Sequence, residues 1–302
     1  MTSTTADRPT RVSTARVGLW DRVKEIWRYR ELLVAFSRTE LKVKYKNSVL
    51  GFAWSMLNPA LYLLVYWVVF DLILGTGIPN FPIFLLSGIL VWNLFATSLG
   101  SATSSVVANA GLVRKVAFPR EILPLASVGA ALVHFFLQAI VLVMALVIFQ
   151  YNVAWSYLPL LPVALFALLF FVAALGILLG SINVYLRDTA HFVELALIAW
   201  FFMTPIVYPY ETVAAKLGNH SWLFLLNPIT DIVLTFQRAI YGQVSGAKTV
   251  DGVTTITKIL PQGVDQWWYL WHLGLVILAS AALFVLALVV FGRAEGNFAE
   301  EL

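Results

Sequence analysis

The sequence contains no cysteine, and charged residues make up only 12% of its 302 positions. The lack of thiols excludes disulfides, iron–sulfur clusters and thiolate metal sites. Soluble domains carry about 25% charged and about 45–50% apolar residues, whereas 60% of this chain is hydrophobic and its mean hydropathy is +0.84. So little charge predicts an integral membrane protein.

Several motifs of enzymes are also absent. No GxxxxGK[ST] phosphate-binding loop occurs, so we expect that the chain does not hydrolyse nucleotide by itself. The four histidines lack HxxxH and HExxH spacing, and no carboxylate pair suited to acid/base work is present. We therefore expect no metal site and no catalytic residue. The N-terminal segment has no apolar run, which predicts that there is no cleavable signal peptide.

Six apolar stretches are long enough to cross a membrane as helices, which takes about 20 residues. They are 49–74, 81–107, 122–149, 157–182, 189–208 and 267–291. A seventh stretch, 222–240, contains Pro228, Asp231 and Arg238, and a charge at a helix centre costs about 2.5–3.5 kcal/mol. We predict interfacial or re-entrant helices over about 209–240 instead. The alternating strands of a barrel are absent, so the predicted fold class is an all-α polytopic membrane protein.

Basic residues are unevenly distributed between the predicted loops. Sixteen of the 20 Lys and Arg fall in residues 1–48, in the loops after the second and fourth spans, and in the C-terminal tail. The positive-inside rule then places both termini in the cytoplasm of a bacterial cell. We predict a cytoplasmic tail with an interfacial helix (1–48), a transmembrane domain (49–292) and a cytoplasmic tail (293–302).

The segment "LWDRVKEIWRYRELLVAF" has the pattern of an amphipathic helix that lies in the membrane interface. Trp20 and Trp27 stand beside charged residues, among them Arg28 and Arg30. The first 46 residues carry a net charge of +6, which would attract anionic lipid headgroups. A plain positive-inside anchor explains the same residues equally well. We expect no nucleic-acid binding, because the basic residues adjoin a span.

A basic segment interrupts the apolar runs between the second and third spans, and its sequence is "NAGLVRKVAFPREILPL". Leu112 and Val116, together with Val113 and Ala117, predict the apolar stripe of a short helix that docks into a groove on a partner. Pro119 is predicted to stop this helix, because the residue before a proline leaves the helical region. The simpler alternative is a basic loop without a partner.

This segment resembles the coupling-helix signature of type-2 ABC exporter permeases for bacterial surface polysaccharides, the Wzm-like and TagG-like subunits. Some residues of the segment carry the resemblance itself, and others would join them in contacting the ATPase subunit that such permeases pair with. Together they are Asn109, Leu112, Val113, Arg114, Lys115, Val116, Phe118, Pro119, Arg120 and Glu121. A second resemblance lies in "ELKVKYKNSVLGFAWSMLNPALYLLVY", at the entry to the first span, and weaker ones lie in "NVYLRD", "TPIVYP" and "LNP". The chain is most similar to actinobacterial permeases that export lipid-linked galactan.

The resemblance implies a permease that works with a separate ABC ATPase subunit, which binds ATP and Mg²⁺, so that this chain holds no cofactor. Two permeases and two ATPases would assemble around one path across the cytoplasmic membrane, and a two-fold dimer is the commonest symmetric assembly. The implied cargo is a lipid-linked polysaccharide such as galactan, O-antigen or a teichoic-acid-like polymer. The alternatives are a type-2 permease for a drug or lipid, and an ion-coupled secondary carrier.

Aromatic residues are abundant, with 21 Phe, 11 Tyr and 11 Trp. Their rings offer flat faces to the C–H faces of sugars, although interfacial belts also use Trp and Tyr. Five aromatics lie within the first, second and fifth spans, away from the predicted interfaces. We predict that they line the substrate path; they are Tyr62, Tyr66, Trp92, Phe201 and Phe202.

Overall fold

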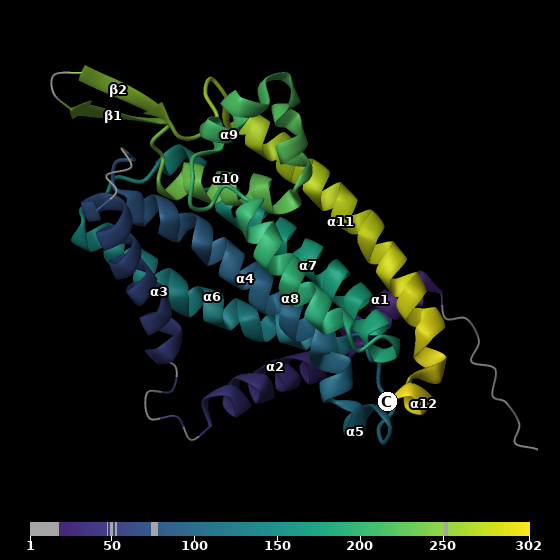
Figure 1. Ribbon diagram of the computed structural model, residues 1–302. Helices are drawn as coiled ribbons and strands as arrows, with labels where there is room; N and C mark the ends of the chain where they lie inside the picture. Colours follow the sequence, from purple (N-terminus) through teal and green to yellow (C-terminus); the bar gives the residue numbers. More distant parts are fainter. Residues whose placement is uncertain (1–17, 47, 49–50, 52, 74–77, 251–252) are drawn as a thin grey trace, which may run out of the picture.

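The computed structural model describes residues 18–46, 48, 51, 53–73, 78–250 and 253–302 (Figure 1). The helices and strands are α1 (Leu19–Arg28), α2 (Arg30–Tyr45), α3 (Ala53–Tyr66), η1 (Trp67–Ile73), α4 (Phe81–Ala108), α5 (Ala110–Val113), α6 (Ile122–Ile148), η2 (Trp155–Tyr157), α7 (Leu160–Tyr185), α8 (Thr189–Phe202), α9 (Tyr210–Leu217), η3 (Gly218–Leu226), α10 (Pro228–Ile240), β1 (Ser245–Val250), β2 (Val253–Lys258), α11 (Gln266–Ala294), η4 (Glu295–Asn297) and α12 (Phe298–Glu301).

Four helices, α4, α6, α7 and α11, are long and apolar enough to cross a membrane. They coincide with four of the six predicted spans. Helix α4 lies at the centre, packed by α6, α7, α8 and α10, and most of its side chains are buried. We call the end of the bundle with α5 and α12 the terminal end, and the end with β1 and β2 the hairpin end (Figure 1).

Small residues bring α4 and α7 close together. A Cβ atom on Gly176 would lie 2.7 Å from the Cβ of Ala102, and one on Gly180 would lie 3.1 Å from the Ala102 carbonyl oxygen. Helices in membranes gain their association from such close backbone packing, because burial of apolar surface gives no driving force in lipid. This contact fixes α7 on α4 and thereby holds the terminal end of the bundle together.

The predicted first and fifth spans are not continuous long α-helices. Part of 49–74 lies outside the described residues, and the rest forms α3 followed by the π-helix η1. The predicted span 189–208 was too long, because α8 ends at Phe202 after 14 residues. Pro205 and Pro209 follow, and neither can donate the backbone hydrogen bond that would continue the helix.

Helices α9, η3 and α10 occupy the stretch 209–240, which was predicted to form interfacial or re-entrant helices, and the pair is bent by 102° at the break. Asn227 joins this pair to the end of α8. Its Oδ1 accepts from Ile229 N at 3.1 Å, which caps α10, and from Trp200 Nε1 at 2.8 Å. Its Nδ2 donates to Thr204 Oγ1 at 3.0 Å. The "TPIVYP" and "LNP" motifs therefore meet in space.

The all-α prediction missed one antiparallel hairpin, in which Ser245 pairs with Lys258 and Val250 with Val253. The signal was present in the sequence: Asp251 and Gly252 separate two runs rich in β-branched residues, and Asp-Gly between such runs is a strong hairpin pattern. Apart from this hairpin, the described secondary structure is helical.

Candidate functional site

The basic segment after α4 contains only a short helix. Helix α5 ends at Val113, and a turn at Arg114 and Lys115 follows. The prediction that Pro119 stops the helix was therefore wrong. Val113 and Phe118 are both buried, yet five residues along a helix are about 140° apart, given 3.6 residues per turn. The chain leaves the helix because only then do both side chains reach the same core.

This core lies at the terminal end and joins the segment to several other helices. Val113 and Phe118 pack with Ile177 of α7, Phe291 of α11 and Phe298 of α12, among others. The ring of Phe118 also lies 5.8 Å from that of Phe36 on α2. The predicted apolar stripe is thus divided, since Val113 faces inward while Val116 is 50% exposed. If the segment moved, every helix that contributes side chains to this core would have to shift with it or repack.

The surface of the segment is basic with a small apolar part. The side chains of Arg114, Lys115 and Val116 are exposed, and Leu112 is half-buried. Asn109 stands before them, and its Nδ2 donates to the Ser105 carbonyl at 2.8 Å, which closes the end of α4. The exposed residues can therefore meet another molecule without unfolding the segment.

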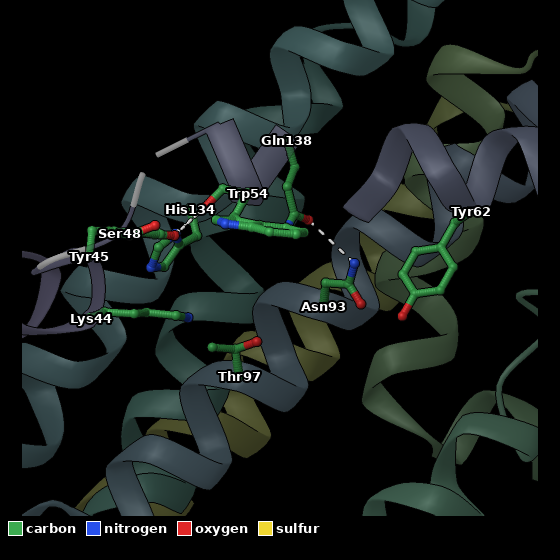
Figure 2. A pocket seen from close by; sticks show the side chains of 10 residues that line it. Lys44, Tyr45, Ser48, Trp54, Tyr62, Asn93, Thr97, His134 and Gln138 are labelled. Carbon is green, nitrogen blue, oxygen red and sulfur yellow. Dashed lines mark hydrogen bonds between the residues drawn. The ribbon is translucent and has the colours of Figure 1, made fainter. Parts of the chain in front are cut away.

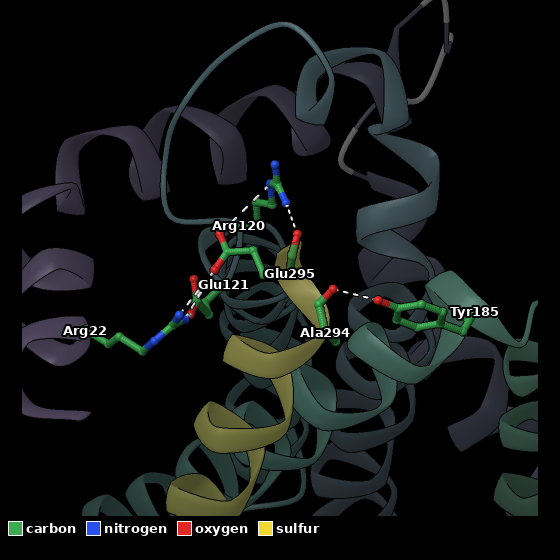
Figure 3. A network of polar contacts seen from close by, with 6 residues as sticks. All are labelled: Arg22, Arg120, Glu121, Tyr185, Ala294 and Glu295. Atoms are coloured by element: carbon green, nitrogen blue, oxygen red, sulfur yellow. Dashed lines mark hydrogen bonds and ion pairs between the residues drawn. The ribbon is translucent and has the colours of Figure 1, made fainter. Parts of the chain in front are cut away.

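Arg120 and Glu121 face the interior of the protein (Figure 3). Arg22 of α1 donates to Glu121 Oε1 at 2.6 Å and to Glu295 Oε2 at 3.3 Å. Arg120 Nη1 donates to the Glu295 carbonyl at 2.5 Å, and its guanidinium lies 5.8 Å from the centre of the Phe298 ring. The network joins α1, the start of α6 and the C-terminal helices.

Glu121 is the most buried member of this network, with 2% of its side chain exposed. Burial raises the pKa of Glu121, and the nearby carboxylate of Glu295 raises it further, while Arg22 lowers it. Desolvation outweighs the ion pair here, because a buried charge loses its hydration on all sides. Glu121 and Arg120 therefore serve to hold the segment in place.

The N-terminal segment forms two helices, with a break at Tyr29. The prediction of a single helix across 19–36 was wrong at this point. Trp20 and Trp27 of α1 are 69% and 71% exposed, and they lie seven residues apart on one face. Arg28 and Arg30 are exposed as well. This face has the composition of a helix at a membrane surface.

The five aromatics predicted to line a path do not gather at one place. Tyr62 and Tyr66 lie on α3 with their ring centres 6.2 Å apart, and Tyr62 is 43% exposed. Trp92 is buried against Phe201, at 5.4 Å between ring centres, and against Phe95. Phe202 is 65% exposed on α8. Within one chain, Trp92 and Phe201 act as packing residues between α4 and α8.

A polar pocket of about 370 Å³ lies between α2, α3, α4 and α6 (Figure 2). Ser55 Oγ lies 2.9 Å from His134 Nδ1, and Tyr45 Oη lies 3.0 Å from the same nitrogen. Asn93 Nδ2 donates to Gln138 Oε1 at 3.3 Å. Our sequence analysis missed this site, although isolated polar residues within apolar spans are a recognised sign of one.

Helix α2 closes the pocket on the side of the terminal end. Ser37 Oγ donates to the Ala126 carbonyl at 2.9 Å, and Ser127 Oγ donates to Glu40 Oε1 at 2.6 Å. Burial raises the pKa of Glu40, although the Ser127 bond and the charge of Lys44 act in the opposite direction. These bonds fix α2 across α6 and set the position of Lys44 at the edge of the pocket.

Comparison with known proteins places these features in one family. The chain is 37% identical over 220 residues to the O-antigen export system permease protein RfbA of Myxococcus xanthus. This aligned region covers 72% of this chain and 84% of that protein. It is 28% identical over 272 residues to the protein of the same name from Klebsiella pneumoniae, covering 90% and 95%.

A more distant relative, the polysialic acid transport protein KpsM of Escherichia coli, is 22% identical over 230 residues, covering 73% of this chain and 85% of that protein. The family model described as "ABC-2 type transporter" matches residues 31–241, a range that runs from α2 to the residue after α10 and includes the basic segment and the polar pocket. The chain therefore belongs to the ABC-2 type transporter family.

Proposed function

We propose that this chain is the permease subunit of an ATP-driven exporter that moves a lipid-linked polysaccharide across the bacterial cytoplasmic membrane. The observation that carries the proposal is the similarity to two O-antigen export permeases, one of which covers 90% of the chain. The aromatic content of the spans agrees with a sugar cargo. Among such polymers, the sequence resemblance favours galactan, so a lipid-linked galactan is the cargo to test first.

In this proposal the exposed part of the basic segment binds the ABC ATPase, which holds ATP and Mg²⁺. Arg114 and Lys115 supply charge and Val116 supplies an apolar contact. Arg120 and Glu121 act behind this surface, because they tie it to α1 and the C-terminal helices. Nucleotide-driven movement of the segment would reach all of these helices together.

Two permeases would pair around the cargo path, since the described helices of one chain form a packed bundle around α4. Tyr62 and Phe202 are exposed and could line such a path between two copies. The terminal end would face the cytoplasm, with α1 at the lipid surface. Two basic stretches of the chain, 18–46 and the segment after α4, lie at or near this end (Figure 1).

The test is complementation in a strain whose own permease gene has been deleted. Export of the polymer should return when this chain is expressed with its ATPase, and should fail when the ATPase carries a substitution in its phosphate-binding lysine. Export with the inactive ATPase would indicate an ion-coupled carrier instead. Restored resistance to a drug or movement of a lipid, without any polymer at the cell surface, would indicate a permease with another cargo.

A further inference from the structure

We propose that the polar pocket between α2, α3, α4 and α6 binds an uncharged sugar unit of the transported polymer. This inference rests on the proposed function and assigns a site for its substrate within one chain. The pocket lies where α2 meets the start of α3, and it extends along α4 and α6 into the bundle (Figure 2). It would hold part of the polymer next to the path between two copies.

The pocket offers hydrogen-bonding groups that the protein itself uses only partly. In the described part of the chain, the 3.3 Å bond from Asn93 to Gln138 is the one hydrogen bond that either side-chain amide makes. Two side-chain groups remain for a ligand. The Asn93 side-chain oxygen Oδ1 can accept a hydrogen bond, and the Gln138 side-chain nitrogen Nε2 can donate one. Thr97 adds an exposed hydroxyl one helical turn along α4. Sugar hydroxyls both donate and accept, so a mixed set suits them.

Aromatic faces complete the pocket. Trp54 and Tyr62 both line it, and they are 47% and 43% exposed. In Figure 2, Tyr62 lies at one end of the group of side chains and Trp54 near its middle beside Gln138, with Asn93 between the two rings. An exposed tryptophan ring gains contact energy when a flat apolar face covers it. The C–H face of a pyranose is such a surface, and its hydroxyls then point toward the amides.

The charge of the pocket favours an uncharged ligand over a phosphate. Among the described residues that line it, Lys44 is the one cation. Glu40 stands one turn earlier on α2, close enough for the charge of Lys44 to lower its pKa. The carboxylate at this distance offsets the lysine. A site for an anion would instead contain several positively charged hydrogen-bond donors, as phosphate-binding sites do.

The size of the pocket sets the length of the bound segment. A volume of about 370 Å³ lies at the lower end of the range of small-molecule sites, about 300–1,000 Å³. A short stretch of polymer fits this space, and the rest of the chain would continue outside it. The hydrogen-bonded group of Tyr45, Ser55 and His134 fixes the junction of α2 and α3 at one wall. The pocket is thereby held open by contacts that do not need the ligand.

The test uses the lack of native cysteine. Thr97→Cys places one thiol in the pocket, and Thr212→Cys on α9 is a matched control outside it, since both threonines are exposed. The full-length proteins are placed in lipid nanodiscs and treated with a maleimide. The probes are neutral tetrasaccharides released from the surface polysaccharide of the producing organism and, separately, inorganic pyrophosphate.

We expect the tetrasaccharides to slow modification of Cys at position 97 by about 10-fold at a concentration ten times Kd, because mass action then leaves about a tenth of the sites empty. Pyrophosphate should have no effect, and adding Trp54→Leu should remove the protection. Protection by pyrophosphate alone, no protection by the tetrasaccharides, or equal slowing at position 212 would overturn the proposal. Export by the Thr97→Cys protein with its ATPase is measured separately, so a working exporter without protection refutes the pocket and leaves the proposed function intact.

Discussion

Arg22 holds the basic segment in place through two carboxylates, and its removal should therefore weaken the whole terminal end. We predict that Arg22→Met destabilises the protein and uncouples ATP hydrolysis from export. Methionine keeps much of the apolar length of the arginine side chain, whose guanidinium group lies against Gly292 of α11. The substitution thus removes mainly the charge and the bonds to Glu121 and Glu295.

The size of the expected loss of stability follows from the burial of the Arg22–Glu121 ion pair. Removing one partner of a buried ion pair costs about 3–5 kcal/mol, because the remaining charge is left without compensation. Arg22 is 15% exposed and Glu121 is 2% exposed, and Glu121 can relieve its isolation by binding a proton. We therefore expect a loss of about 2–3 kcal/mol, which is about 30- to 150-fold in the unfolding equilibrium.

The loss should depend on pH. The folded-state pKa of Glu121 is raised above its ordinary value, so the folded protein loses stability as the pH rises from the unfolded pKa to the folded pKa. Arg22→Met removes the group that lowers this pKa, and the folded pKa should rise further. Lowering the pH from about 7.5 to about 5.5 should therefore restore more stability to the variant than to the wild type.

The measurement is the free energy of unfolding in mixed micelles of a mild and a denaturing detergent. The single variant Glu121→Gln and the double variant complete a mutant cycle. The two substitutions should be non-additive by about 1–3 kcal/mol, because the residues are in direct contact. A loss below about 0.5 kcal/mol, the range of ordinary surface substitutions, would refute the reasoning, as would additivity of the two changes. ATPase activity and export of the reconstituted complex then show whether coupling is lost with the contact.

Three further predictions test the surface, the orientation and the path. Arg114→Glu with Lys115→Glu should weaken ATPase binding by about 1–3 kcal/mol and abolish export, because both side chains are exposed; unchanged co-purification would remove this surface from the coupling role. In intact cells, Ile256→Cys should react with an impermeant thiol reagent and Ala117→Cys should not, and the reverse pattern would invert the orientation. Tyr62→Leu should reduce export as Tyr62→Ala does if the ring stacks on sugar. Wild-type export by the Leu variant would instead assign Tyr62 to packing, since volume-conserving apolar substitutions cost less than about 1.5 kcal/mol.

The long helices could be predicted because their apolar runs contain few residues that stop a helix. The start of α4 at Phe81 and of α6 at Ile122 agree with the sequence interpretation. The shorter α8 also had a signal in Pro205, which we read as part of the span 189–208. The hairpin had one in Asp251 and Gly252. These errors came from giving apolar length more weight than turn chemistry.

The contacts of the candidate sites could not be predicted, because they join residues far apart in the chain. Arg22 and Glu121 are separated by 99 positions, and Asn93 and Gln138 by 45. A single sequence gives the residue types but not the pairing. It indicated that the basic segment is special, yet it did not reveal that Glu121 faces inward.

The shortness of α8 has a consequence for the lipid around the protein. Its 14 residues measure about 21 Å at 1.5 Å per residue, against a hydrocarbon layer of about 30 Å. Asn227 fixes the point where α8 ends, so the helix cannot lengthen to match a thicker bilayer. If α8 is the fifth span, as the sequence predicts, the lipid beside it must adapt by thinning, at a cost of fractions of a kcal/mol per Å. Acyl chain length thus becomes a variable of transport, and membranes of shorter lipids should place less elastic strain on the working protein.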